Sequence, residues 1–347
     1  MISNLTPQRS LRGHLPARPT ARIANSGHHQ AALAHRLTSR DRWLARMLYE
    51  HRVLTSQQIA EIAFPSIRSA NHRLLDLYRW RVLDRFQPFT TTGTMPMHYV
   101  LDVAGAAALA FEDGIDPTRL AYRHERAVGI AYSLRLAHDV AANGIFSSLI
   151  STSRRPDRTG ELTMWWSAAR CASRLDDIVR PDGYGRWRTA AGTELEWFLE
   201  FDFGTEAPRI LAAKLAGYHQ LARTTGFVTP ILICFPSARR ESTVRTVLAG
   251  AQASLGQPQL VPVATSCTEL FGDAASVAGP SWLPLTQLTQ HTSGRLEFAE
   301  LSRVWPTSPR QPTTNSNTVA PEIRTAELVA PHPLPPDHPH HVLGNTP

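Results

Sequence analysis

The chain has 347 residues, enough for two or three domains with sizeable cores, and 42% of them are hydrophobic, which is ordinary for a globular protein. Its net charge of +7 favours a polyanionic partner, nucleic acid ahead of a membrane surface, although a basic tail without a specific role would give the same excess. No apolar run approaches 18 residues, and the N-terminus lacks the apolar stretch of a signal peptide. The cysteines are few and widely spaced, which argues against a disulfide framework or a zinc cluster. We therefore expect a cytoplasmic protein without a membrane span.

The two ends of the chain have the composition of disordered segments. Residues 1–36 are rich in Arg, Pro, His and Ser, contain no acid and show no sustained periodicity, so we expect a flexible basic arm. Residues 306–347 contain ten prolines and few large apolar side chains. This range is predicted to be a disordered, partly extended tail.

Three short amphipathic segments follow the arm, at residues 39–51, 55–63 and 66–80. Thr55 with Gln58 three residues later is a capping-box pattern, which marks the start of the second helix. Two strand-like runs then flank a loop rich in Thr, Gly and Pro, at residues 82–86 and 98–101. A helix-turn-helix followed by a hairpin predicts a winged helix over 37–111, whose third helix would enter the DNA major groove.

The third predicted helix carries polar and basic side chains on the faces that its apolar stripe leaves free. Side chains of these types hydrogen-bond base edges and phosphates. The candidate DNA-contacting residues are Arg68, Ser69, Asn71, His72 and Arg73 on this helix and Arg85 on the first strand of the hairpin. The alternative is a small helical bundle in which these residues are only solvated.

After a linker over 112–118, the pattern changes to that of an α/β domain. A long helix is predicted over 124–142, apolar runs typical of strands over 144–151, 163–172, 177–182, 194–203, 229–235 and 259–264, and helices over 206–218 and 239–253. Helices and strands in this order predict one compact domain over 118–305.

The stretch from Glu194 to Tyr218 reads as a strand that runs into a helix. Its period-two pattern places Glu200 and Asp202 side by side on one face of the strand. Lys214, on the helix, is the only lysine among the 36 Lys and Arg residues of the chain. A compact ammonium group can orient a water or bind a phosphate oxygen where a guanidinium cannot substitute. A lysine that remains by chance is the alternative.

Asp182 follows the preceding apolar run and joins these residues in a predicted metal site. Asp182, Glu200 and Asp202 would bind Mg²⁺ or Mn²⁺, because such hard cations take oxygen ligands and keep several waters. The cation would polarise a phosphodiester, and Lys214 would orient the attacking water or stabilise the transition state, with Glu200 as its catalytic partner. In the alternative, the acids pair with neighbouring arginines at a solvated sheet edge: Arg180, Arg186 and Arg209.

Pro181-Asp182 and Glu200-Phe201-Asp202 resemble the motif of the PD-(D/E)xK restriction-endonuclease-like superfamily. That superfamily has lysine two residues after the acid, where this chain has Asp202, so Lys214 would supply the ammonium from a migrated position. Glu125 matches a place where such folds sometimes add an acid. The resemblance implies an α/β (α+β) chain in which a winged helix-turn-helix precedes a restriction-endonuclease-like mixed-sheet domain, with disordered termini. It also implies a candidate metal-dependent endodeoxyribonuclease.

Further segments extend the resemblance over about residues 37–290: the predicted winged helix, His124-Glu125, Arg180-Pro181-Asp182, Phe198 to Glu206 with Lys214 and Tyr218, and Val263-Ala264-Thr265 with Trp282. This layout resembles the replication-relaxation family of plasmids and integrated mobile elements. It implies a role in plasmid replication and DNA relaxation or copy control, with double-stranded DNA as partner. Replication or conjugation proteins and a second copy of the chain are further expected partners. The alternative is a non-catalytic regulator of transcription or copy number with a degenerate nuclease-like fold.

Overall fold

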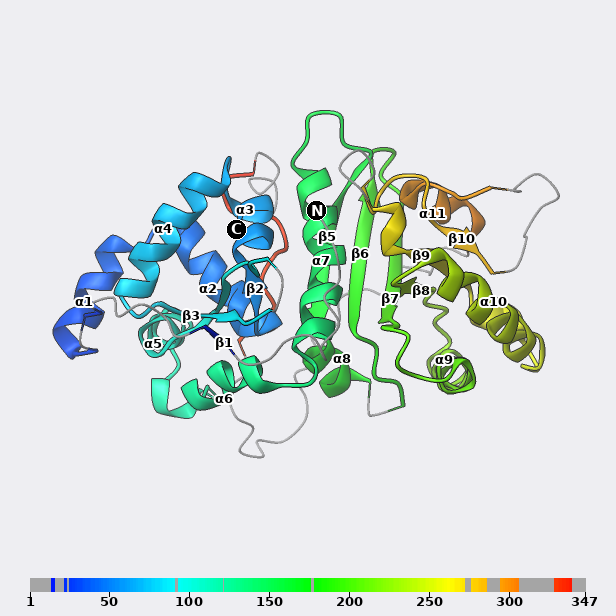
Figure 1. Cartoon of the computed structure of the whole chain (residues 1–347), viewed down its shortest axis with the longest axis horizontal. Coiled ribbons are helices and arrows are strands. Elements are labelled where there is room, and N and C mark those ends of the chain that lie inside the picture. The colour runs from blue at the N-terminus through cyan, green and yellow to red at the C-terminus, as the bar shows by residue number, and fades with distance from the viewer. Residues whose placement is uncertain are drawn as a thin grey trace.

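The structure is a computed structural model that describes residues 14–15, 22–23, 25–90, 93–120, 122–175, 178–271, 276–285, 294–305 and 328–338. A helical unit with a small sheet lies beside a larger sheet that is covered by helices (Figure 1). The mixed α/β class that the sequence predicts is confirmed. Within the described residues, every helix is too short or too polar to cross a membrane.

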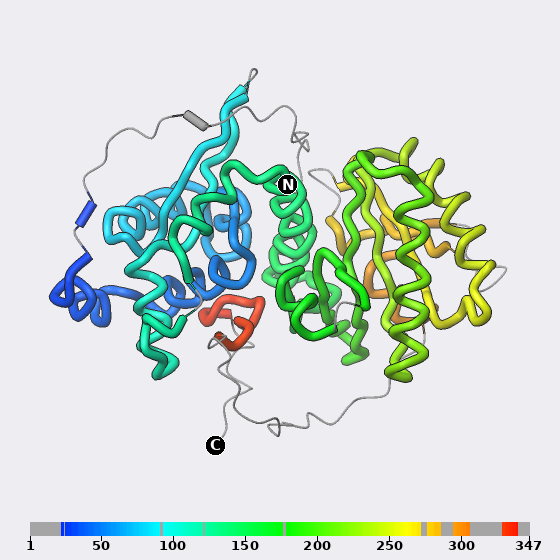
Figure 2. Tube along the Cα trace, turned by 90° about the horizontal axis from the view of Figure 1, so that it is seen from below, coloured from blue at the N-terminus to red at the C-terminus, as the bar shows by residue number. Residues whose placement is uncertain are grey.

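The N-terminal unit, which comprises the described residues up to 120, combines short helices with a small antiparallel sheet. Its main elements are α1 (Gly27–Arg36), α2 (Ser39–His51), β2 (Leu54–Thr55), α3 (Ser56–Ala63), α4 (Ile67–Arg79), β3 (Leu83–Pro88), β4 (His98–Leu101) and α5 (Val103–Glu112). The predicted capping box of Thr55 and Gln58 is present at the start of α3. Strand β4 lies between β2 and β3, and β1 (His14–Leu15) pairs with the outer edge of β3. The hairpin of β3 and β4, cyan in Figure 2, projects from the unit.

Helix α1 departs from the prediction of a flexible arm over 1–36. Ser26 caps the helix by accepting a hydrogen bond from the His29 N–H, and Leu33 is only 1% exposed. The arm was predicted from its polar composition, but Leu33 is buried against the rest of the unit. Over residues 27–36 the prediction is therefore wrong.

The predicted helix over 124–142 and strand over 144–151 are rearranged in the structure. A short helix, α6 (His124–Gly129), is separated by a turn from α7 (Leu136–Ser153). The predicted strand over 144–151 is wrong, because these residues lie inside α7. Most of them are buried, and a continuous apolar run does not distinguish a buried helix from a buried strand.

The sheet unit, residues 136–305 as described, contains a six-stranded sheet in the order β10-β9-β8-β7-β6-β5. Its further elements are β5 (Gly160–Ser167), α8 (Ala168–Arg174), β6 (Gly183–Thr189), β7 (Glu194–Phe201), α9 (Pro208–Thr225), β8 (Ile231–Phe235), α10 (Ala238–Ala253), β9 (Val263–Cys267), β10 (Leu283–Pro284) and α11 (Leu301–Val304). Strands β7, β8 and β9 are parallel, and the other neighbours are antiparallel. Helix α7 covers one face, and α9 and α10 cover the other (Figure 1).

Three strand predictions in this unit needed correction at their boundaries. The run over 163–172 divides into the end of β5 and helix α8, and the run over 259–264 is displaced to β9. In the run over 177–182, the described residues 178–182 precede β6 instead of forming it. Asp182 therefore lies before a strand, where the sequence placed it at the end of one.

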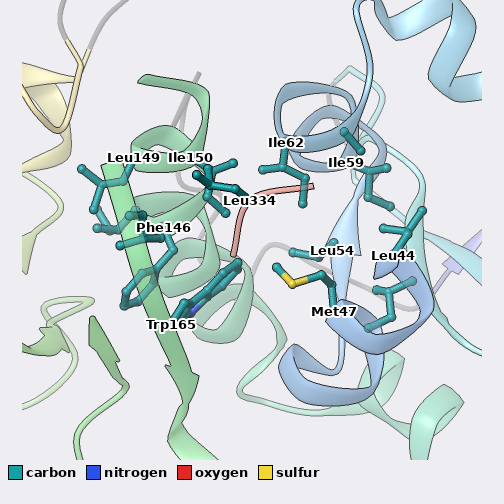
Figure 3. Close-up of a cluster of buried hydrophobic side chains, with 14 of the residues drawn as sticks. Leu44, Met47, Leu54, Ile59, Ile62, Phe146, Leu149, Ile150, Trp165 and Leu334 are labelled. Atoms are coloured by element: carbon teal, nitrogen blue, oxygen red, sulfur yellow. The ribbon is translucent and has the colours of Figure 1, made fainter. Parts of the chain in front are cut away.

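One hydrophobic core continues across the seam between the two units. Met47 of α2 and Ile62 of α3 face Phe146 and Ile150 of α7 and Trp165 of β5 (Figure 3). All five side chains are at most 2% exposed. The helical unit and the sheet unit are therefore held together by apolar packing.

Residues 328–338 also lie in this seam, where they appear in red between the two units (Figure 2). Leu328 and Leu334 are each 2% exposed. The prediction of a disordered tail over 306–347 is therefore wrong for these residues, because apolar side chains spaced among the prolines are buried.

Candidate functional site

Asp182 and Glu200 are brought together by the pairing of β6 with β7. The Asp182 N–H donates to the Leu199 carbonyl at 2.8 Å, and the Phe201 N–H donates to Asp182 Oδ2 at 2.8 Å. The Asp182 carboxylate is thus fixed beside the end of β7. Glu200 projects from the same end of β7, on the face that α9 covers.

Helix α9 supplies two partners for Glu200. Lys214 and Tyr218 are four residues apart, so both lie on one face of the helix. The Lys214 Nζ donates to Glu200 Oε2 at 2.8 Å, and the Tyr218 hydroxyl donates to Oε1 at 2.6 Å. Both carboxylate oxygens are therefore engaged, although the Lys214 side chain remains 40% exposed. The sequence pattern correctly placed the sole lysine beside Glu200.

The protonation of Glu200 is shifted by its surroundings. Burial, followed by the negative charge of Asp182, raises the pKa of Glu200 to about 7, and Lys214 and Tyr218 offset only part of this effect. Burial alone would lower the pKa of Lys214, but the charge and hydrogen bond of Glu200 outweigh it and raise that pKa. Near neutral pH, Glu200 therefore holds a proton far more readily than an ordinary glutamate, while Lys214 stays charged.

Asp182 is contacted from helix α7 by two residues that sequence reasoning missed. His138 Nε2 lies 3.1 Å from Asp182 Oδ2, and Arg135 Nη2 lies 3.5 Å from Oδ1. Burial lowers the pKa of His138, but the hydrogen bond and charge of Asp182 outweigh it, so the net shift is upward. Arg135 and His138 are three residues apart on one helix. This spacing alone does not indicate that they lie near Asp182, which the packing of α7 on the sheet decides.

Asp202 has a different partner. Its Oδ2 accepts from Arg240 Nε of α10 at 2.7 Å, and its Oδ1 accepts from the Gly204 N–H at 2.8 Å. The side chain is 4% exposed. Asp202 therefore fixes the turn after β7 and connects it to α10. Sequence reasoning proposed other arginines as partners, and Arg186 instead pairs with Glu196 at 2.7 Å.

These contacts do not fit the predicted cation site. Among the described residues, three ligand-type side chains gather within 4.8 Å only at Asp84, Asp102 and His124, in the N-terminal unit. There the Arg22 guanidinium donates to both carboxylates. Asp182, Glu200 and Asp202 do not form a group of this kind. Asp202 instead forms an ion pair with Arg240. The arrangement is an ion-pair network and not a set of three acids open to one hard cation.

Glu125, the additional acid, lies exposed in the first turn of α6. Among the described residues it does not gather with Asp182 and Glu200 into a group of three ligand-type side chains. The residue beside it, His124, contacts Asp84 at 2.9 Å instead. Helix α6 packs on β3 and β4, so its acid belongs to the N-terminal side of the molecule.

A cavity of about 290 Å³ adjoins Asp182. Both units line it, with His51 and Arg52 from the end of α2 and Arg135, His138 and Asp139 from α7. Arg52 lies 3.6 Å from Asp139, so part of the positive charge around the cavity is already paired.

The predicted DNA-contacting residues divide into two groups. Arg68, Asn71 and His72 are exposed on the outer face of α4, and none has a hydrogen-bond or ion-pair partner in the described part of the chain. Ser69 instead donates to the Ser66 carbonyl at the start of the helix, at 2.9 Å. These three exposed residues define what we call the α4 face.

Arg73 and Arg85 are engaged inside the N-terminal unit. Arg73 donates to Asp41 from Nε at 3.0 Å and also from Nη2, and its guanidinium lies over the Trp80 ring. Arg85 lies over the Tyr78 ring, 4.3 Å from its centroid. Both are predicted DNA contacts, and in this structure both contact side chains of their own unit. Sequence periodicity places Arg73 on a polar face of α4. It does not show that Asp41 of α2 lies next to that side chain.

Comparison with known proteins gives one positive finding. Residues 46–232 match the replication-relaxation family, a range that runs from α2 to β8 and includes Asp182, Glu200 and Lys214. Searches of curated proteins and of solved structures give no match. Because the family match covers more than half of the chain, the protein belongs to the replication-relaxation family.

Proposed function

We propose that the protein binds double-stranded DNA through its N-terminal unit, in the replication of a plasmid or mobile element. The observation that carries this proposal is the α4 face, where Arg68, Asn71 and His72 are exposed and have no partner among the described residues. Their side chains offer a charge for phosphate and donors and acceptors for base edges. The basic net charge of +7 supports an electrostatic attraction to DNA.

The order of elements in the N-terminal unit supports assignment as a winged helix. Helix α2, strand β2, helices α3 and α4 and then the β3–β4 hairpin follow one another as in that motif. Helix α4 would be the recognition helix. The projecting hairpin (Figure 2) would be the wing that contacts the DNA backbone.

For the sheet unit, the ion pairs favour a non-catalytic role. Asp182, Glu200 and Asp202 are each paired with basic side chains of neighbouring helices. Bringing a cation to them would require these contacts to open. We therefore propose that the sheet unit is a platform that positions the N-terminal unit on DNA or binds replication proteins.

DNA binding is tested with the full chain and a labelled 30-base-pair duplex, by fluorescence anisotropy over a range of salt concentrations. We expect Arg68→Ala to weaken binding several-fold and to reduce the salt slope by about one ion, as for loss of one phosphate contact. Arg155→Ala, which removes an exposed arginine from the sheet unit, is the matched control. Equal losses in both variants would reject the α4 face as the DNA-binding surface.

A second candidate function is metal-dependent DNA cleavage, favoured by the 2.8 Å contact of Lys214 with Glu200 beside Asp182. Supercoiled plasmid incubated with the protein and Mg²⁺ or Mn²⁺ provides the test. Nicked product that disappears in Lys214→Met would support cleavage. If the plasmid stays intact with the wild-type chain and either metal, DNA cleavage is rejected. The proposal of DNA binding does not depend on this result.

A further inference from the structure

We propose that the seam between the two units is a binding groove for a proline-rich peptide, and that residues 328–338 of this chain are its tethered ligand. The sequence of this segment is Leu-Val-Ala-Pro-His-Pro-Leu-Pro-Pro-Asp-His. It contacts both units, through helices α2, α7 and α8.

The apolar part of the groove is centred on Leu334. This side chain is 2% exposed and lies beside Ile150 of α7, on the side that faces Ile62 of α3 (Figure 3). The flanking Pro333 and Pro335 are also buried. Val329, in contrast, is 78% exposed, so the segment presents one side to the groove and the other to solvent.

The N-terminal unit contributes two polar contacts to the segment. Trp43 Nε1 of α2 donates to the His332 carbonyl at 2.7 Å. Arg40, also on α2, forms an ion pair with Asp337. An aromatic side chain that donates to a carbonyl within a Pro-rich stretch is typical of grooves that recognise extended proline peptides.

The sheet unit contacts the segment at its two ends. Arg170 of α8 donates to the Leu328 carbonyl at 2.9 Å, and His338 Nε2 donates to the Ser153 carbonyl at 3.2 Å. The same Arg170 binds the buried Glu50 of α2, at 2.6 Å. The peptide therefore joins an ion pair that already connects the two units.

Proline content suits this role on energetic grounds. Prolines restrict the free peptide to extended conformations, so little conformational entropy is lost on binding. Proline also lacks an N–H group, so burial of Pro333 and Pro335 leaves no backbone donor unsatisfied. The groove therefore has to supply hydrogen-bond donors mainly for carbonyl groups. Trp43 and Arg170 are two such donors.

Residues 306–327 connect the segment to the sheet unit, which makes binding intramolecular. A tether of this length gives an effective concentration on the order of millimolar. At micromolar protein, the segment of the same chain therefore outcompetes that of a second copy. Occupancy within one chain holds the N-terminal unit, with its α4 face, in a fixed orientation to the sheet unit.

The test uses the full chain and a fluorescein-labelled peptide of residues 326–340, with binding followed by anisotropy. Leu334→Asp in the chain should release its own segment and open the groove, so that the peptide binds at least about tenfold more tightly than to the wild-type chain. Val329→Asp is the matched control, since that position faces solvent, and it should bind the peptide as weakly as the wild type. A peptide that itself carries Leu334→Asp should not bind any variant.

Two outcomes of the comparison between the wild type and Leu334→Asp would overturn the proposal. One is a folded Leu334→Asp chain, shown by circular dichroism, that does not bind the peptide. The other is a wild-type chain that binds it as tightly as the variant does. Because Leu334 is buried, Asp337→Arg serves as a second variant, which reverses an exposed charge opposite Arg40 and should raise peptide binding about twofold to fivefold. No increase with Asp337→Arg would count against the groove as well.

Discussion

On the α4 face, Arg68, Asn71 and His72 extend into solvent without partners in the described part of the chain, whereas at the end of β7 each acid is held by basic side chains. Both regions are rich in charged and polar groups. They differ in what a ligand would have to displace. At the α4 face it replaces only water, but at Glu200 it must replace Lys214 or Tyr218.

The difference has consequences for stability as well as for binding. A solvated side chain can be removed with little effect on folding. A buried charged group leaves its partners unsatisfied when it is removed, and the penalty is several times larger. The two regions should therefore respond in opposite ways to substitution: DNA affinity should change at the α4 face, and unfolding free energy should change around β7.

Substitution of Glu200 by alanine should have the largest effect on stability. It removes the acceptor of both the Lys214 ammonium and the buried Tyr218 hydroxyl. We expect a loss of about 3 kcal/mol in unfolding free energy, measured by urea denaturation. The three-residue α4 face lies on another unit, so DNA affinity measured well below the unfolding transition should stay within twofold. A variant as stable as the wild type would show that Glu200 is not the centre of a structural network.

The pH dependence of stability should identify the same network. Glu200 has a pKa of about 7 in the fold against an ordinary value of 4.5, so the folded chain binds more protons at this site between these values. The contribution of Glu200 to the unfolding free energy is complete below pH 4.5 and is lost as the pH rises through 7. His138, whose pKa is also raised, acts in the same direction above pH 6.5.

Glu200→Gln removes the titrating carboxyl and keeps a hydrogen-bonding side chain of the same size. From pH 5 to pH 8 the wild type should lose on the order of 2 kcal/mol more unfolding free energy than this variant. Urea denaturation at both pH values measures the difference. Parallel pH profiles for the two proteins would contradict a raised pKa at Glu200.

Much of the local structure could be predicted from the sequence, because its signals are local. The capping box at Thr55, the strand with Glu200 and the helix with Lys214 each depend on residues within one turn or one strand. Helix α7 was missed over 144–151 because burial on most sides removes the amphipathic period. The segment 328–338, with its buried Leu328 and Leu334, was missed because its partners are distant in sequence.

The candidate site was predictable only in part. The sole lysine was correctly placed beside Glu200, since strand and helix follow each other in the chain. The pairing of Asp202 with Arg240, and of Asp182 with His138, depends on how α10 and α7 pack on the sheet. Among the many arginines of this chain, composition gives no means of choosing the one that lies opposite a given acid.

Arg73 and Arg68 allow the comparison to be made within a single helix. Arg73→Ala leaves the buried Asp41 without its guanidinium partner, so we expect a loss of about 1–2 kcal/mol in unfolding free energy. Arg68→Ala should change stability by less than about 0.5 kcal/mol. DNA affinity, measured at a temperature where both variants are folded, should fall more in Arg68→Ala. The reverse order of affinities would indicate that Arg73 leaves Asp41 to contact DNA.

Lys214→Met should have only a small effect on stability near pH 6, although Lys214 is the residue that the sequence singled out. Its side chain is 40% exposed, so solvent screens its ion pair with Glu200, and Glu200 can take up a proton near neutral pH. We expect a loss below about 1 kcal/mol at pH 6, where Glu200 is mostly protonated, and a larger loss at pH 8, where the buried carboxylate is left with the Tyr218 hydroxyl alone on its oxygens. Thermal denaturation at the two pH values measures this. An equal loss at both would mean that Glu200 does not change its charge in this range, and that the ammonium is needed for a reason other than neutralising it.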